Sequence, residues 1–289
     1  GIMNSFASKV KNEISSVKNE NLQEATAKLQ GMLVFGGKFK EESFLVSYEN
    51  KEVAEKLSSL VSFALPLLKL EKETLKTAKK TLYLFKMDSN QKILKDLISS
   101  KPQNLEAFIS GAFLSCGSIT NPQVDYHLEF HLSSLDLCNI LMDALKNLEQ
   151  IKLDPKIIKR RGSYFVYIKG NEKIKDFLVL IGANSCAMEF IQVKMIKEVR
   201  NNINRTTNFE TANLSKITGS SSEHIKAIKK IIRHKKLESL PENLKEIAKL
   251  RLENPYVSLK ELSNLCEKPV SKSGVNHRLK KLIEIAENL

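Results

Sequence analysis

The sequence predicts an α+β domain built from two similar halves, followed by a second domain made only of helices. Three observations support this division. The chain has 289 residues, which is more than one average hydrophobic core requires. A pattern of helices and strands occurs twice in roughly the first 190 residues. After Val193 the strand pattern stops, and most of the excess positive charge follows that point.

Composition excludes several classes of protein. Hydrophobic residues make up 42% of the chain and charged residues 27%, which is typical of globular proteins and excludes a disordered chain. No run of about twenty apolar residues occurs, so no membrane helix is expected. The polar N-terminal stretch lacks the apolar centre of a signal peptide, which predicts a cytoplasmic protein. We expect four buried, reduced thiols and no cofactor, because no CxxC pair occurs among Cys116, Cys138, Cys186 and Cys266.

The positive charge is unevenly distributed along the chain. Lys and Arg number 46 against 33 Asp and Glu, a formal net charge of +13. Residues 192–289 hold 20 basic and 11 acidic side chains, whereas the preceding 191 residues hold 26 and 22. A general preference for lysine raises the charge everywhere and does not explain this asymmetry. A polyanionic partner does, because basic side chains release the counterions of nucleic acid phosphates.

Two blocks of about eighty residues repeat the order helix, strand, helix, strand, helix. Each begins with an apolar helix that contains glycine, and each carries a basic stretch before its second strand. We predict an N-terminal helical extension at 1–21 and a repeat domain at 22–192, with halves at about 22–101 and 102–192. The paired segments are helices 27–37 and 107–118, strands 43–49 and 125–132, helices 51–65 and 134–148, strand-ending segments 68–87 and 151–170, and helices 91–99 and 173–182.

Glycine occupies the same place in the two opening helices. Gly31 and Gly111 each begin a GxxxxxG spacing. Glycine costs about 1 kcal/mol inside a helix, so a close approach of two backbones is the expected compensation. We therefore predict that the two opening helices pack against each other as a pseudo-twofold seam. The alternative is two unrelated core helices that each contain glycine.

The opening helices resemble the signature helices of LAGLIDADG homing endonucleases. LQGMLVFGG (Leu29–Gly37) and ISGAFLSCG (Ile109–Gly117) carry the resemblance, which covers residues 22 to 190. In that family the acidic residue before the final glycine coordinates the divalent metal that drives phosphodiester hydrolysis. The corresponding residues here are Gly36 and Cys116, and neither supplies the carboxylate oxygen that Mg²⁺ prefers. The resemblance implies a retained fold without nuclease activity, so no catalytic or metal-binding residue is predicted.

Two features of the repeat domain leave alternatives open. The strand 125–132 alternates polar and apolar residues, which predicts a half-buried strand whose polar face is solvated or faces a ligand. A metal site on that face is the alternative. The basic stretches of the two halves either contact DNA or are solvated hairpin tips. The polar face comprises Asp125, His127, Glu129 and His131; the basic stretches comprise Lys76, Lys79, Lys80 and Lys156, Lys159, Arg160, Arg161.

The last hundred residues carry strong signals for helix ends. Pro241 is suited to the first turn of a helix that ends near Asn254. Ser258 and Glu261 form a capping box for a short helix over 259–266. After a tight turn, Ser271 is a good N-cap for a last helix over 272–287. We predict a connector at 193–208, whose spacing allows a helix while a flexible linker is the alternative. A helix-turn-helix domain is predicted at 209–289, with its motif at about 258–287.

The last helix separates apolar from polar residues. Val275, Leu279 and Leu282 share one face with Ile283, and the opposite face is basic and rich in hydrogen-bonding groups. Asn reads adenine and Arg or Lys reads guanine in the major groove, so this face is predicted to contact DNA. An ordinary amphipathic surface helix is the alternative. The predicted contact residues are Ser271, Lys272, Ser273, Asn276, His277, Arg278, Lys280 and Lys281.

The segment before the motif is predicted to form two helices around a Gly-Ser turn at 219–222. Its basic residues occur at near-helical spacing, which predicts secondary contacts to phosphates rather than to bases. A solvated lysine face is an equally good interpretation. The residues concerned are Lys226, Lys229, Lys230 and Arg233.

Taken over its whole length, the chain resembles the WhiA family. The resemblance is carried by the two degenerate LAGLIDADG blocks, by RNNINRTTNFETANLSK (200–216) and by SLKELSNLCEKPVSKSGVNHRLKKLIEIAE (258–287). It implies a C-terminal domain similar to region four of primary sigma factors and a non-catalytic N-terminal domain. It also implies a transcriptional regulator of cell division and chromosome segregation, and of sporulation in sporulating relatives.

The partners implied are double-stranded DNA and RNA polymerase or another regulator, with the chain located at the nucleoid and away from membranes. Two other functions remain as alternatives. One is a protein- or ligand-binding module on the repeat domain, with DNA binding secondary. The other is a residual nuclease or RNA maturase, which would need acidic residues at positions 36 and 116.

Overall fold

A computed structural model describes residues 5–289 and divides into two compact units, which meet at Lys197 and Glu198. The first four residues of the predicted N-terminal extension lie outside this description. Each unit encloses its own hydrophobic core. None of the helices in the described part of the chain is long and apolar enough to cross a membrane.

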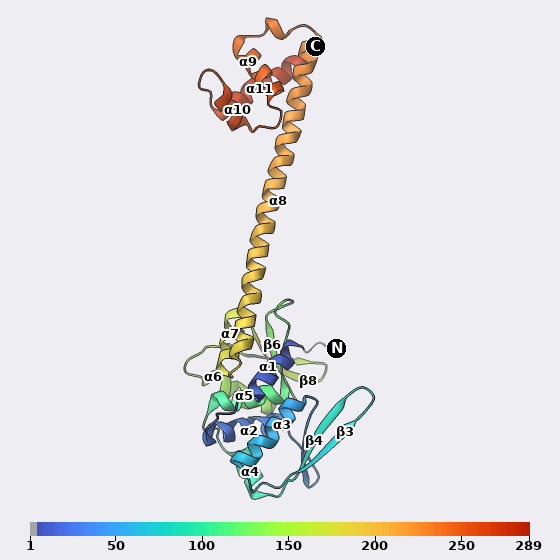
Figure 1. Ribbon diagram of the computed structural model, residues 1–289, viewed down its shortest axis with the longest axis vertical. Coiled ribbons are helices and arrows are strands. Elements are labelled where there is room, and N and C mark those ends of the chain that lie inside the picture. Colours follow the sequence, from blue (N-terminus) through green and yellow to red (C-terminus); the bar gives the residue numbers. More distant parts are fainter. Residues whose placement is uncertain (1–4) are drawn as a thin grey trace. The chain divides into compact units, whose positions relative to one another are not determined.

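The first unit is an α+β domain of two similar halves, as predicted (Figure 1). Each half forms a four-stranded antiparallel sheet, which we call sheet A (order β1-β2-β4-β3) and sheet B (order β5-β6-β8-β7). The elements of the first half are α2 (Leu22–Gly36), β1 (Lys38–Lys40), β2 (Ser43–Tyr48), α3 (Lys51–Ala64), β3 (Glu71–Lys76), β4 (Thr81–Asp88) and α4 (Lys92–Ser99). Those of the second are α5 (Leu105–Cys116), β5 (Gly117–Ile119), β6 (His127–Leu132), α6 (Leu135–Lys146), β7 (Lys156–Arg160), β8 (Ser163–Lys169) and α7 (Asn171–Leu180).

Helices α2 and α5 pack against each other, which confirms the predicted seam. A Cβ atom added at Gly31 would overlap the carbonyl oxygen of Phe108, and one added at Gly111 would overlap the carbonyl oxygen of Lys28. The two contacts are reciprocal: each glycine admits the backbone of the opposite helix. Both helices are buried over most of their length, so the seam forms the centre of the first core.

The strands contribute one face each to this core. Phe44, Val46 and Tyr48 of β2 are buried, and so are Leu128, Phe130 and Leu132 of β6. The predicted alternation of the strand at 125–132 is therefore confirmed, although Asp125 lies before the strand begins. N-terminal to the repeat, helix α1 (Phe6–Ser15) buries one side against the same core and is capped by the Ser5 hydroxyl.

Each half contains two strands more than its sequence pattern predicts. The segments expected to contribute one strand each form the hairpins β3–β4 and β7–β8, and short strands β1 and β5 follow the opening helices. Every residue of β3 and of β7 is exposed, so these strands lack the apolar alternation from which strands are recognised.

Helix α8 (Asn184–Arg233) corrects one prediction. The turn expected at 219–222 does not form, and the helix continues through it. The segment contains no proline, and a single glycine costs a helix only about 1 kcal/mol. Packing within the second unit supports the continuation, because the Ser221 hydroxyl donates to the carbonyl of Pro255 and Ala227, Ile228 and Ile231 enter the core.

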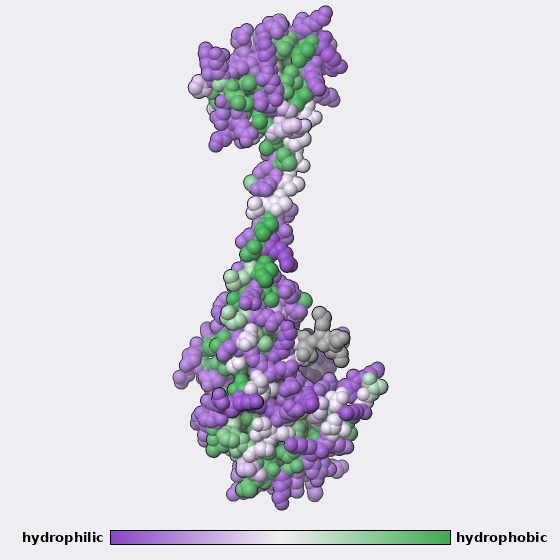
Figure 2. Space-filling model, viewed as in Figure 1, coloured by the Kyte–Doolittle hydropathy of each residue, from purple (hydrophilic) through white to green (hydrophobic). Residues whose placement is uncertain are grey.

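The stretch of α8 from 198 to 216 is exposed on all sides. Apolar side chains along it, including Val199, Ile203, Phe209 and Leu214, are each more than half exposed. They alternate with polar and charged residues, and both kinds of surface are visible along the helix in Figure 2.

The second unit contains the C-terminal part of α8 and three further helices, which are α9 (Glu242–Glu253), α10 (Leu259–Leu265) and α11 (Lys272–Glu287). A single 3-10 turn at Leu237–Ser239 precedes α9. The predicted capping box is confirmed, since the Ser258 hydroxyl accepts from the Glu261 amide while the Glu261 carboxylate accepts from the Ser258 amide. Helices α9, α10 and α11 lie beside the end of α8 in Figure 1. Apolar residues of all four helices form one small core.

Candidate nucleic-acid interface

The candidate interface is built on α11, which its cap and its apolar face hold in place. The Ser271 hydroxyl accepts a hydrogen bond from the Gly274 amide at 3.0 Å and fixes the first turn. Val275, Leu279 and Leu282 are at most 1% exposed. These three positions anchor one face of the helix, so the opposite face must point to solvent.

The structure places the predicted contact residues on that outward face. The side chain of Ser271 is exposed, but its hydroxyl already caps the helix, so its role here is structural as well. The acidic residues of α11 begin only at Glu284, which leaves the first three turns without a negative charge. Exposed positions are Ser271, Lys272, Ser273, His277, Lys280 and Lys281; Asn276 and Arg278 are half-buried.

Helix α10 and the turn that follows it set the direction in which α11 begins. Leu262 of α10 is buried in the same core as Val275. The amide of Glu267, in the turn, donates to the Glu246 carboxylate of α9 at 2.6 Å. A short helix, a tight turn and a second helix with an exposed basic N-terminal half form the arrangement by which helix-turn-helix proteins enter the major groove.

A buried arginine supports the loop between α9 and α10. Arg251 is 2% exposed, and its guanidinium donates to the carbonyls of Val257 at 2.9 Å and Asn254 at 3.3 Å. Sequence reasoning missed this residue, because an arginine in an amphipathic helix is normally exposed. These two bonds join α9 to the loop, and burial lowers the pKa of the guanidinium.

His224 of α8 lies near the Arg251 guanidinium and is 7% exposed. Its Nδ1 atom has no hydrogen-bond partner among the described residues. Burial lowers the pKa of the imidazole and the nearby Arg251 charge lowers it further, while Glu223 opposes the shift. The folded unit therefore binds a proton at His224 less readily than the unfolded chain does.

This difference predicts acid sensitivity of the second unit. The folded pKa of His224 lies below the unfolded value of about 6.5. The free energy of unfolding of the second unit is therefore unaffected by His224 above that pH and decreases as the pH falls below it. We expect the urea midpoint of the second unit to fall between pH 7.5 and pH 5.5. In His224→Gln, which cannot titrate, that fall should be smaller. An identical pH dependence in the two proteins would contradict the prediction.

The predicted secondary phosphate contacts lie on the C-terminal part of α8. Lys226, Lys229 and Arg233 are exposed and Lys230 is half-buried. They alternate with Ala227, Ile228 and Ile231, which face the core. The basic side chains therefore extend away from the core of the second unit, where phosphates or solvent can reach them.

The ends of the signature helices hold no carboxylate. Gly36 packs beside Ser115, whose hydroxyl donates to the Met32 carbonyl and bonds the Tyr48 hydroxyl, each at 2.8 Å. Burial raises the pKa of the Cys116 thiol to about 12, so the thiol is protonated at neutral pH. No group of three or more His, Cys, Asp or Glu suited to a metal occurs in residues 5–289, including the polar face of β6.

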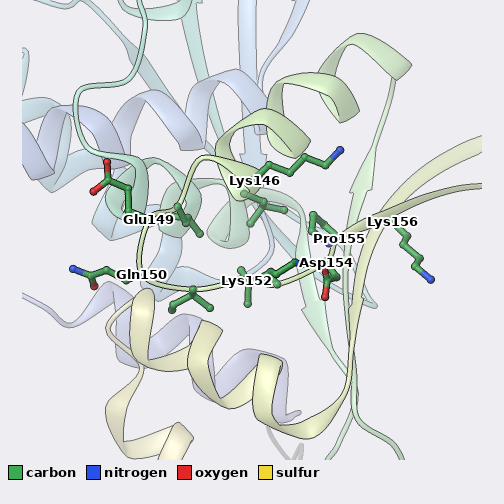
Figure 3. A pocket seen from close by; sticks show the side chains of 11 residues that line it. Lys146, Glu149, Gln150, Lys152, Asp154, Pro155 and Lys156 are labelled. Carbon is green, nitrogen blue, oxygen red and sulfur yellow. The ribbon is translucent and has the colours of Figure 1, made fainter.

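A hollow of about 720 Å³ lies along the loop that joins α6 to β7. Its lining comes from one segment of the chain, residues 145–146 and 148–156. The labelled side chains in Figure 3 spread along the loop, with Glu149 and Gln150 on one side and Lys156 on the other. The Asp154 carboxylate is engaged by Lys173 at 2.8 Å. These side chains do not converge, so the hollow offers no binding chemistry comparable with that of α11.

Comparisons with known proteins agree with this architecture. Residues 203–286 match the WhiA C-terminal HTH domain and residues 105–200 match the WhiA LAGLIDADG-like domain. A probable cell division protein WhiA of Caldicellulosiruptor bescii is 39% identical over 99% of this chain and 95% of its own length. The corresponding protein of Clostridium acetobutylicum is 37% identical over 99% and 98%.

The fold also agrees with a solved structure. Full-length DUF199/WhiA from Thermatoga maritima superposes with a TM-score of 0.63 at 27% identity, over 99% of each chain. The similarity in sequence and in fold thus extends over both units. The chain belongs to the WhiA family, with its LAGLIDADG-like domain and its C-terminal helix-turn-helix domain.

Proposed function

We propose that this protein is a sequence-specific, duplex-DNA-binding transcriptional regulator without catalytic activity. The observation that carries the proposal is the outward face of α11, which is basic, rich in hydrogen-bonding groups and free of acids over its first three turns. Such a face complements both the phosphates and the base edges of a major groove.

Within this function the side chains divide into two roles. Asn276, His277 and Arg278 lie in the first two turns of α11, where recognition helices approach base edges. Lys280 and Lys281, in the next turn, would bind phosphates together with the exposed lysines of α8. The relatives' names support regulation of cell division genes as the cellular role. The absence of carboxylates at Gly36 and Cys116 supports a non-catalytic first unit.

Selection from a random duplex library tests this function. We expect the full-length chain to enrich one sequence motif, and its affinity for that motif to fall roughly a thousandfold between 50 and 200 mM salt if about six phosphates are neutralised. Asn276→Ala should remove the base preference at one or two positions of the motif while leaving the salt dependence of the affinity unchanged. Enrichment of no motif, or binding that salt does not weaken, would exclude a sequence-specific DNA regulator.

A further inference from the structure

The face of sheet B that points away from the helices carries aromatic rings stacked across the strands. His131 of β6 lies against Phe165 of β8, with ring centroids 4.8 Å apart and planes 13° apart. His127 lies against Tyr167 in the same way, at 5.7 Å and 24°. The strand register places all four rings on one face, because the alternate residues of both strands are buried in the core.

Cations accompany these rings. The Arg160 guanidinium lies 4.4 Å from the centroid of Phe165, and Lys169 Nζ lies 5.7 Å from that of Tyr167. Lys156 is paired with Tyr167 in the register of β7 and β8 and shares the same face. Glu129 is the acidic residue on this face, and its carboxylate lies 3.0 Å from His127 and 3.7 Å from Arg160. We call this set of rings and cations the sheet B platform.

Sheet A provides an internal comparison, because its register matches that of sheet B residue for residue. Where sheet B has the pair His131 and Phe165, sheet A has Ser47 and Leu84. Where sheet B has Lys156 and Arg160, sheet A has Glu71 and Leu75. The corresponding face of sheet A thus carries no ring, and its three acids are balanced by three lysines. It comprises Lys38, Lys40, Ser43, Leu45, Ser47, Glu71, Glu73, Leu75, Leu82, Leu84, Lys86 and Asp88.

This asymmetry decides which form of nucleic acid fits. A duplex held between both sheets would find an excess of cations on sheet B alone, because the three acids of the sheet A face balance its three lysines. The bases of a duplex are also paired and stacked internally, so they cannot stack on protein rings. A single strand has free bases, and aromatic side chains interleaved with cations on a sheet face are the surface on which such bases stack.

We infer that the sheet B platform binds single-stranded DNA, stacking its bases on the rings of His131, Phe165 and Tyr167 and pairing its phosphates with Arg160, Lys156 and Lys169. The choice of DNA over RNA rests on the proposed function, which brings the chain to DNA. The platform itself does not depend on α11.

The test measures binding of the full-length chain to a labelled twenty-residue thymidine oligonucleotide and to a duplex. The double variant Phe165→Leu, Tyr167→Leu removes two rings and keeps apolar side chains on the strand. We expect it to lower single-strand affinity at least about tenfold, since stacking on one ring contributes a factor of that order. Duplex affinity should stay unchanged. Leu84→Ala, at the matching position of sheet A, is the control and should leave both affinities unchanged.

The outcomes separate this inference from the proposed function. Equal single-strand binding by the ring variant and the native chain overturns the platform. A uridine oligonucleotide that competes better than its thymidine counterpart overturns the assignment to DNA. Charge reversal at Lys280 and Lys281 should lower duplex affinity about a hundredfold and leave single-strand affinity unchanged. If that variant instead loses both ligands, the single strand binds at α11 and the inference fails while the proposed function stands.

Discussion

Charge reversal on α11 should strongly weaken duplex binding: we expect Lys280→Glu with Lys281→Glu to lower affinity about a hundredfold near 0.1 M salt. Both lysines are exposed on the third turn of the helix, opposite Leu279 and Leu282, which face the core. Each lost phosphate contact removes one released counterion, so the slope of log affinity against log salt should fall by about two. Fluorescence anisotropy with a labelled duplex over a salt series measures both quantities.

The matched control carries the same change in net charge on the first unit. Lys92 and Lys95 are exposed on α4, and Lys92→Glu with Lys95→Glu alters the total charge identically. If duplex binding depends on α11, this control retains the native salt slope. A control that weakens binding as strongly as the α11 variant would show that only overall charge matters.

The second large effect concerns the seam between α2 and α5. We expect Gly31→Ala to destabilise the first unit by about 3 kcal/mol or more, because the added methyl overlaps a backbone carbonyl that no rotamer change can move. For a unit of this size that corresponds to a fall in melting temperature of roughly 10 °C. Scanning calorimetry of the full-length chain measures it.

Two comparisons make this prediction specific. Gly111→Ala should cost a similar amount, and the double variant should cost less than the sum, because one widening of the seam relieves both overlaps. Gly219→Ala should instead stabilise α8 slightly, by about 1 kcal/mol, since a methyl there meets no atom within 4 Å. Native stability in Gly31→Ala would contradict the close approach of the two backbones.

Features encoded by a few neighbouring residues were predictable from the sequence. The capping box at Ser258 and the N-cap at Ser271 depend on side chains three residues from the amides they bind. The packing of α2 against α5 was predictable for a different reason: the two halves of the repeat have a glycine, Gly31 and Gly111, at the same position of their first helix. The outward face of α11 follows from helical periodicity once its ends are fixed.

Features that depend on tertiary packing were not predictable. The Gly-Ser segment at 219–222 has every local signal of a turn, yet Ser221 and the residues after it are held in a helix by the second core. Strands β3 and β7 have no buried face to reveal them. The rings of His131 and Phe165 are 34 positions apart in the sequence, and only the register of β6 with β8 brings them together.

The reciprocal glycines also constrain how this domain can be divided or inherited. A chain reduced to one half would leave the apolar length of α2 uncovered, and only a partner with a glycine at the matching position could approach closely enough to cover it. The other half is such a partner, and a second copy of the same half is another. Each half can thus be replaced at this contact by another half with a glycine at the matching position, but it cannot be left out. A larger side chain at either glycine is tolerated only if the opposite helix moves away.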